Sequence, residues 1–195
     1  DVLVESSKNR QIVLATHSPF FVPLECLDSG MQIARVYKQE KGSAIGQLKE
    51  STAKELAALL ADANNPHVLG LDAREVLFLE DNVILVEGQE DVIAYRRLQK
   101  ELGIAVGASF FGWGVGGASK MATIATALFD LGVQRVFGVL DGDKKDEKDR
   151  LGQRFLQYKF ATIPTSDVRT KPARKAELSK KGLLDDRGSL RSEYS

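Results

Sequence analysis

The fold is decided by the stretch Val83–Asp91, which reads VILVEGQED. Its four leading apolar residues are mostly β-branched, as in a strand buried on both faces, and Gly88 marks a turn after them. The next segment, Gln89–Leu102, repeats apolar residues at helical spacing before it meets a glycine. The inward positions of that helix are expected to be Val92, Tyr95, Leu98 and Leu102. A buried strand that leads directly into an amphipathic helix indicates a parallel sheet with crossover helices.

The same alternation continues toward the C-terminus. A helix with a regular apolar face is predicted after a glycine-rich loop at residues 112–117, and apolar runs precede and follow this unit. The predicted elements are strands at Ile104–Phe111, Arg135–Leu140 and Phe160–Ile163, and helices at Ser119–Leu131 and Lys148–Tyr158. The expected fold class is therefore α/β, a Rossmann-like parallel sheet flanked by helices.

The residues before Val83 have a different pattern. Gln11–Thr16 is an apolar run typical of a buried strand, and Gln32–Lys38 alternates like a second strand. Thr52–Ala61 is spaced as an amphipathic helix, and a polar Asn-Asn-Pro break follows it. We therefore expect residues 1–50 to form one unit, residues 51–79 a helical linker and residues 80–195 the α/β domain.

The composition sets limits on function without choosing one. The 195 residues are 43% hydrophobic, enough to bury a core, and 27 basic side chains balance 27 acidic ones. A net charge of zero neither requires nor excludes nucleic acid, so the distribution of charge matters more. Residues 168–181 hold six basic side chains and one acid. Within this cluster, the candidates for contact with a DNA backbone are Arg169, Lys171, Arg174 and Lys175, although such a run is more often a solvated face.

The cysteine and histidine content argues against a disulfide framework and against zinc. Cys26 is the only cysteine, which favours a reducing compartment, and His17 and His67 are the only histidines. No apolar run approaches the ~18–20 residues of a membrane span, and no secretory signal is visible. The expected location is the cytoplasm. Because the chain lacks an initiator Met, we expect it to be a fragment of a longer protein.

Acidic residues follow two of the predicted parallel strands. Glu87 comes after the first, and Asp141 and Asp143 come after Arg135–Leu140. Since ligands bind at the carboxyl ends of parallel strands, these carboxylates should converge, and Asp91 could turn back toward the same edge from the first helix. Carboxylates ~4 Å apart repel by roughly 4 kcal/mol at an effective dielectric constant near 20, so a cluster needs protons, partners or cations. The pattern favours Mg²⁺ or Mn²⁺, and two such ions can assist phosphoryl displacement.

Each signal also has a simpler explanation. A carboxylate at a strand end is more often a cap or a solvated loop residue, and Asp-Gly-Asp is often an ordinary turn. The loop at 112–117 could be a bare turn or a backbone cradle for phosphate, and Trp113 could stack on a base or plug the loop. The further acids Glu90, Asp146, Glu147 and Asp167 are more often solvated charges than ligands. It is the combination on one sheet edge that favours metal chemistry.

Three of these stretches resemble the Toprim domain. VILVEGQED resembles its first motif, a strand ending in Glu-Gly with an acid four residues after the Glu, and VLDGD at Val139–Asp143 resembles its Asp-x-Asp motif. The glycine loop resembles the loop between these motifs. Upstream, QIVLATHSPFF at Gln11–Phe21 resembles the late strand and switch histidine of ABC-type ATPases. An ATPase tail joined to Toprim by a short helical segment is similar to the bacterial OLD (overcoming lysogenization defect) nucleases, which Arg74–Phe78 and Ile163–Arg169 also resemble.

The resemblance implies a metal-dependent DNA endonuclease with a role in phage defence. Carried over by position, Glu87, Asp91, Asp141 and Asp143 would be metal ligands for two Mg²⁺ or Mn²⁺ ions, and Glu87 could be the general base. Among the nearby cations Lys120, Lys144 and Lys145, Lys120 would assist catalysis with Glu87 and Asp141. His17 would contact ATP only in the full-length protein, because no P-loop occurs here. The implied partners are DNA, an N-terminal ATPase portion and a second copy in a homo-oligomer.

Two rival functions remain open from the sequence. A phosphatase of the haloacid dehalogenase type also places Asp-x-Asp after an apolar strand, and would use Asp141 as a covalent nucleophile. A non-catalytic Toprim module would bind DNA or support assembly without cutting. The phosphatase leaves Glu87 and the glycine loop unexplained, and the passive module does not require the four acids.

Overall fold

The computed structural model of the chain describes residues 2–61, 71–163 and 178–184. A parallel four-stranded sheet with the order β4-β3-β5-β6 forms its centre. The strands are β3 Asn82–Val86, β4 Ser109–Phe110, β5 Arg135–Leu140 and β6 Lys159–Thr162. The long pairing of β3 with β5 matches Asn82 with Arg135 and Val86 with Val139. The observed architecture is thus the α/β class with a parallel sheet, as predicted.

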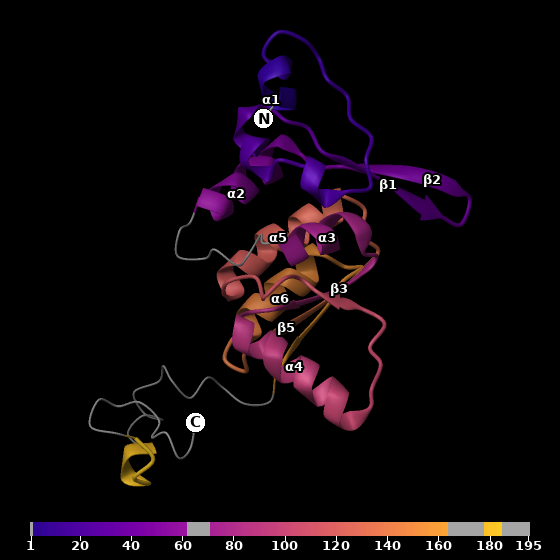
Figure 1. Ribbon diagram of the computed structural model, residues 1–195. Helices are drawn as coiled ribbons and strands as arrows, with labels where there is room; N and C mark the ends of the chain where they lie inside the picture. Colours follow the sequence, from indigo (N-terminus) through magenta and orange to yellow (C-terminus); the bar gives the residue numbers. More distant parts are fainter. Residues whose placement is uncertain (1, 62–70, 164–177, 185–195) are drawn as a thin grey trace.

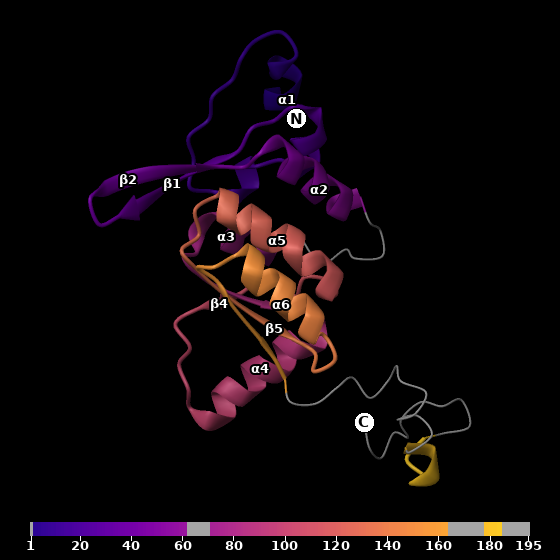
Figure 2. The ribbon, with the colours of Figure 1, turned by 180° about the vertical axis from the view of Figure 1, so that it is seen from behind.

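Helices cover both faces of this sheet. Helix α4 (Gln89–Leu102) lies on one face, and α5 (Ala118–Asp130) and α6 (Lys145–Arg154) lie on the other (Figures 1 and 2). Alternate residues of β3 point to opposite faces. Val83 and Leu85 therefore belong to the core under α5, whereas Ile84 and Val86 pack with Val92 of α4.

The N-terminal elements lie together at one end of the α/β part (Figure 1). They are α1 Val2–Ser7, the 3₁₀ helices η1 Pro19–Phe21 and η2 Leu24–Ser29, the hairpin β1 Ala34–Gln39 with β2 Gly42–Gln47, α2 Glu50–Ala61 and α3 Leu71–Leu79. Leu24, Leu56 and Leu77 from these elements are buried in the same apolar cluster as Val83 and Leu85. The core is therefore continuous from the N-terminal elements into the sheet.

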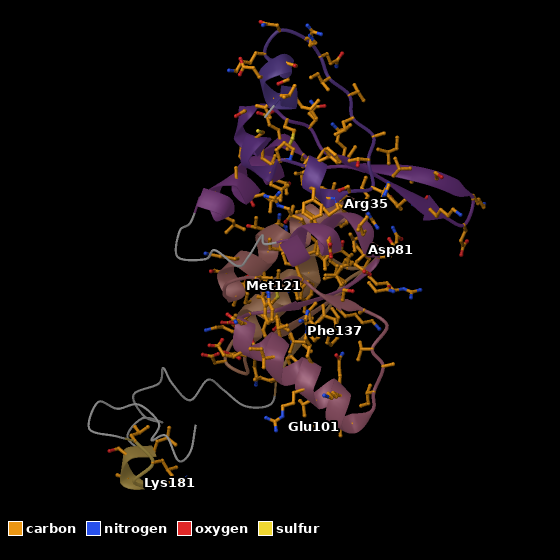
Figure 3. The ribbon with its side chains drawn as sticks, viewed as in Figure 1. Arg35, Asp81, Glu101, Met121, Phe137 and Lys181 are labelled. Atoms are coloured by element: carbon orange, nitrogen blue, oxygen red, sulfur yellow. The ribbon has the colours of Figure 1, made fainter. Side chains whose placement is uncertain are left out.

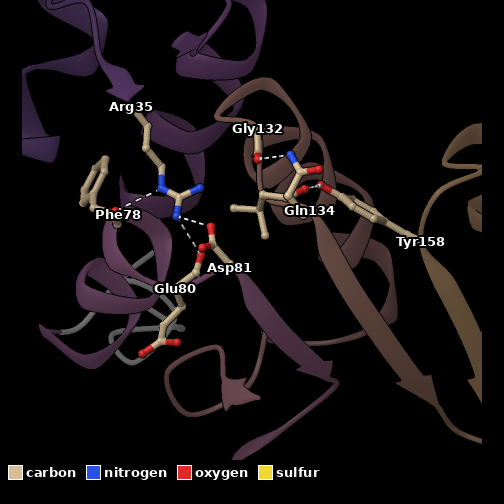
Figure 4. A network of polar contacts seen from close by, with 8 residues as sticks. Arg35, Phe78, Glu80, Asp81, Gly132, Gln134 and Tyr158 are labelled. Atoms are coloured by element: carbon tan, nitrogen blue, oxygen red, sulfur yellow. Dashed lines mark hydrogen bonds and ion pairs between the residues drawn. The ribbon is translucent and has the colours of Figure 1, made fainter. Parts of the chain in front are cut away.

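Polar contacts hold the hairpin against the amino end of the sheet. The Arg35 guanidinium donates to the carbonyl oxygens of Phe78 at 3.0 Å and Glu80 at 3.2 Å, and it pairs with Asp81 at 2.6 Å, directly before β3 (Figures 3 and 4). In β2, Gly46 lies so close to the backbone of Leu131 that a Cβ atom would collide with it.

A second polar junction joins α2 to the end of α5. The Asp130 carboxylate is buried, accepts a hydrogen bond from the Thr52 hydroxyl at 2.6 Å, and forms an ion pair with Lys49 at 3.1 Å. The backbone N–H of Lys49 also donates to this carboxylate, at 3.2 Å. Because a buried carboxylate is costly without such partners, this junction favours one specific docking of α2 on α5.

The structure agrees with several predicted elements. Helix α4 and strand β5 have the predicted bounds, and α2, α5, β3 and β6 lie within one or two residues of theirs. The predicted strand at Gln32–Lys38 corresponds to β1, but its hairpin partner β2 was not predicted. None of the helices in the described ranges is long and apolar enough to cross a membrane.

Four predictions of local structure were wrong. Gln11–Thr16 forms no strand and is exposed, because no strand in the described residues pairs with its backbone. The strand expected at Ile104–Phe111 is reduced to Ser109–Phe110. The third helix spans Lys145–Arg154 instead of Lys148–Tyr158, since Phe155 and Tyr158 leave the helix and stack on each other.

The fourth error concerns the apolar face of α4. Leu98 and Leu102 were expected inward, yet they are 47% and 65% exposed. A helix of 14 residues is about 21 Å long. The parallel pair of β3 with β4 spans only two residues, so the second half of α4 extends past the sheet that it was expected to cover.

The Arg35 contacts should contribute strongly to stability. Arg35→Ala removes a buried guanidinium and leaves two backbone carbonyls without their donor, so we expect a loss of about 2–4 kcal/mol in the free energy of unfolding. The matched control is Arg97→Ala, which breaks an exposed pair with Glu101 and should cost less than about 0.5 kcal/mol. Urea denaturation of both variants checks this, and equal losses would contradict it.

Tyr158 should make the fold sensitive to alkaline pH. Its hydroxyl donates to the Val133 carbonyl at 3.0 Å, and burial, reinforced by the negative charge of Asp130, raises its pKa well above the usual value. An unfolded tyrosine titrates near pH ~10. The stabilising contribution is therefore complete below that pH, and it declines as pH rises further, because the unfolded chain then loses a proton that the folded chain keeps.

Tyr158→Phe should accordingly change stability in two ways. At pH 8 the variant should lose about 1 kcal/mol with the hydrogen bond. Above pH ~10 its stability should fall less steeply with pH than that of the wild type. Urea midpoints measured between pH 8 and 11 test this, and parallel declines would show that Tyr158 does not titrate differently in the two states.

Candidate active site

Glu87 and Asp141 meet at the carboxyl edge of the sheet. Glu87 directly follows β3 and Asp141 directly follows β5, and these strands are neighbours. The backbone N–H of Asp141 donates a hydrogen bond to Oε1 of Glu87 at 2.8 Å. This bond fixes the Glu87 side chain across the ends of both strands, so the expected convergence of these two residues is observed.

The glycine loop wraps around the turn that carries Glu87. The N–H of Val115 donates to the Val86 carbonyl at 2.9 Å, and the N–H groups of Gly116 and Gly117 donate to the Glu87 carbonyl at 3.0 and 2.8 Å. These amides are therefore engaged by the protein itself. The sequence left open a bare turn or a cradle for phosphate; because these amides bond to the turn of Glu87, they act as a brace for that turn, which argues against the cradle.

Gly114 makes this brace possible through close packing. Its φ of 93° lies in the left-handed region, which favours glycine. A Cβ atom at this position would lie 2.7 Å from the backbone carbon of Gly88, the residue after Glu87. The backbone of the glycine loop is therefore in direct contact with the backbone of the turn after β3.

The electrostatics of the edge act mainly on Glu87. Partial burial raises the pKa of its carboxyl above the ordinary value, and the nearby charge of Asp141 raises it further. The backbone N–H groups of Asp141 and Ala118 and the charge of Lys144 oppose this increase. Glu87 is thus a carboxyl group for which a proton or a cation would relieve both desolvation and repulsion.

The Asp91 carboxylate makes a structural hydrogen bond at the same edge. Its Oδ2 accepts a hydrogen bond from the N–H of Gly88 at 2.9 Å, which closes the first turn of α4. Burial, followed by the charges of Asp91 and Asp141, raises the pKa of Tyr95. Tyr95 therefore lies in the field of both acids. From the sequence, Tyr95 is expected only on the apolar face of α4, although its position four residues after Asp91 is a signal that the two share a helix face.

Asp143 and Lys144 continue the turn after β5. The Asp143 side chain is only 12% exposed, and its carboxylate lies 3.6 Å from the Lys144 ammonium. Lys144 also donates its backbone N–H to the Asp141 carbonyl at 3.0 Å. Of the three candidate lysines, Lys144 is the one whose charge acts on Glu87. Lys120 lies in the first turn of α5 after the glycine loop, and Lys145 is exposed.

The four predicted metal ligands do not form a ready-made coordination sphere. Across the described ranges, no group of three or more His, Cys, Asp or Glu side chains is arranged to hold a metal ion. Glu87 and Asp141 are joined by the backbone N–H of Asp141, and the charge of Asp141 acts on Glu87, so these two acids are the candidates to supply hard oxygen ligands. That pair fits one Mg²⁺ or Mn²⁺, since Mg²⁺ commonly binds one or two carboxylates and completes its octahedron with water and phosphate oxygens.

The remaining candidates lie elsewhere. Glu90 and Asp146 are exposed, Glu147 lies 3.8 Å from Arg150 in an ion pair, and His17 is in an exposed loop before η1. Asp167 and the candidates Arg169, Lys171, Arg174 and Lys175 fall outside the described residues. A cavity of about 390 Å³ lies between α3, α4 and β4 and does not include the acids of the edge.

Comparison with known proteins does not assign the chain to a family. No protein-family model matches the chain, and no curated protein has significant sequence similarity to it.

Gly114 should be intolerant of a side chain. Gly114→Ala places a methyl group against Gly88 in a backbone conformation unfavourable for alanine, so we expect a loss of about 1–3 kcal/mol in unfolding free energy. Gly107→Ala is the matched control, because its Cβ would meet open space, and it should change stability by less than about 0.5 kcal/mol. Thermal denaturation distinguishes the two, and a stable Gly114→Ala variant would refute the close packing.

Proposed function

We propose that this chain carries a Toprim-type nuclease domain, which hydrolyses DNA phosphodiester bonds with divalent metal at the carboxyl edge of its sheet. The observation that carries the proposal is the meeting of Glu87 and Asp141, joined by the 2.8 Å hydrogen bond from the Asp141 N–H to Glu87 Oε1. Two carboxylates held at neighbouring strand ends, both of them partly buried, are an arrangement suited to metal-assisted phosphoryl chemistry.

The residues of the edge have separate tasks in this proposal. Glu87 and Asp141 hold the cation, and Asp91 and Asp143 are candidates to complete its surroundings when substrate is present. A divalent ion bound there would neutralise charge on the phosphate and make a bound water more acidic. The raised pKa of Glu87 suits a carboxylate that accepts a proton from the attacking water. Lys144, or Lys120 from α5, would offset negative charge that develops on the phosphate oxygens.

The finer parts of the proposal rest on sequence resemblance. The likeness to OLD nucleases implies two metal ions, coupling to an ABC-type ATPase through residues 1–50, and a homo-oligomer. The cytoplasmic location is instead the expectation from the cysteine content. We include them in the proposed function of the full-length protein, with ATP bound only there. DNA is the proposed partner.

Glu87→Gln tests the proposal most directly. The amide keeps the size of the side chain and an oxygen that can accept the Asp141 N–H, but it removes the charge and the basicity. We expect plasmid cleavage with Mg²⁺ or Mn²⁺ to fall by ~10²–10⁴-fold, as for the loss of a positioned acid or base, while folding survives. Glu101→Gln, at the far end of α4 (Figure 3), makes the same chemical change away from the edge and should cut at the wild-type rate.

Other outcomes select the rival functions. A haloacid-type phosphatase would tolerate Glu87→Gln and form an aspartyl-phosphate on Asp141. A passive binding module would show no metal-dependent cleavage in the wild type. Wild-type cutting by Glu87→Gln, with contamination excluded by a chelator control, would end the catalytic assignment of Glu87.

A further inference from the structure

Aromatic rings and one arginine form a stack on the face of the sheet that α4 covers. The Arg96 guanidinium carbon is 5.3 Å from the centre of the Trp113 ring and 6.0 Å from that of Phe110. Tyr95 stacks on Phe110, with 6.3 Å between ring centres and 16° between ring planes. Phe110 is buried, whereas Trp113 is only partly buried and Arg96 is exposed. The stack thus runs from the core to the surface.

Its position follows from the glycine loop. Trp113 immediately precedes Gly114, which packs against Gly88, the neighbour of Glu87. Arg96 follows Tyr95, the tyrosine that lies in the field of Asp91 and Asp141. The backbone of Trp113 therefore lies close to the turn that carries Glu87, and its ring packs on the face of the sheet that α4 covers.

Arg96 differs from its neighbour Arg97 in its charge partners. Arg97 pairs with Glu101 at 2.7 Å, but in the described part of the chain Arg96 forms no ion pair. No carboxylate of those residues therefore lies within ion-pair distance of its guanidinium. On its other side Arg96 borders the 390 Å³ cavity, whose lining includes Glu75 and Glu80 and is unfavourable for phosphate. The surface beside Trp113 is therefore more favourable for a nucleic-acid strand than this cavity is.

The contact between Arg96 and Trp113 is weak enough to be exchanged. An exposed cation–π pair contributes about a 2- to 5-fold factor to an equilibrium, whereas a nucleobase stacked on an aromatic ring contributes about 5- to 150-fold. A base can therefore replace the guanidinium on the indole ring with a net gain. The displaced arginine, on a long side chain, remains close enough to contact a neighbouring phosphate.

We propose that Trp113 and Arg96 form a binding site for one unpaired base and its adjacent phosphate in a DNA strand beside the Glu87–Asp141 edge. This inference rests on the proposed nuclease function. It makes Trp113 a substrate-positioning residue, which favours DNA with a single-stranded or frayed end over a fully paired duplex.

The test uses the fluorescence of Trp113, which is the only tryptophan in the chain. The 195-residue protein is titrated, without metal, with a single-stranded thymidine oligonucleotide and with an abasic oligonucleotide of equal length. We expect the thymidine oligonucleotide to quench the fluorescence and to bind more tightly, by about 5- to 150-fold. Equal quenching and equal affinity for the two strands would overturn the proposal, as would no binding of either.

Variants provide an independent measurement by filter binding of the same oligonucleotides. Trp113→Ala should weaken binding of the thymidine strand by about 5- to 150-fold and leave the abasic strand unaffected, while Trp113→Phe should retain part of the affinity. Arg96→Ala should reduce the slope of log affinity against log salt by about 0.7, and the control Arg97→Ala should leave it unchanged. Wild-type affinities in both Trp113 variants would also overturn the proposal.

These results separate the inference from the function on which it rests. A protein that cuts plasmid with Mg²⁺ but does not distinguish thymidine from abasic strands is a nuclease without this base site. A protein that distinguishes the strands but never cuts has the base site, and the nuclease proposal fails.

Discussion

In the parallel pairing of β3 with β5, Val86 lies opposite Val139, so the two strands end within a residue of each other. That register brings Glu87 next to the backbone N–H of Asp141, and it leaves the turn after β3 open to the amides of the glycine loop. A shift of one residue would turn every side chain of β3 to the opposite face, and it would exchange the β3 residues that pack under α4 with those that pack under α5. The edge therefore depends on the packing of the whole sheet.

The two ends of the sheet differ in how well their charged side chains are compensated. At the amino end, Arg35 and Asp81 attach the hairpin, and Asp130 with Thr52 attaches α2. Arg35 and Asp130 are the buried charges among them, and both have hydrogen-bond partners, which is the condition for keeping such groups in a core. At the carboxyl end, Glu87 is partly desolvated and lies beside a second acid, so its charge is less well compensated. Uncompensated charge of this kind is expected where a ligand supplies the missing partner.

Much of the α/β part could be predicted from sequence because its signals are local. The apolar run of β3, the helical spacing of α4 and α5 and the glycines after them depend on residues close together in the chain, and parallel topology then places Glu87 and Asp141 at one edge. The errors arose where contacts with residues distant in the chain decide whether a segment forms a strand or whether a side chain is buried. Gln11–Thr16 has the composition of a strand, but a strand exists only with a neighbour to accept its hydrogen bonds. Leu98 had the spacing of a core residue, but the sheet beneath it is too short.

In the α/β part, the sequence by itself determined the order of strands and helices along the chain and the acids at two strand ends, because these follow from periodicity and chain direction. Only the tertiary structure decided what each side chain does there. Asp91 closes the first turn of α4, the loop amides are occupied by Glu87 and Val86, and Lys144 is the lysine whose charge reaches Glu87. The physical reason is that hydrogen bonds and charge interactions act over a few ångströms between residues far apart in the chain. Their partners are set by packing, which no local pattern encodes.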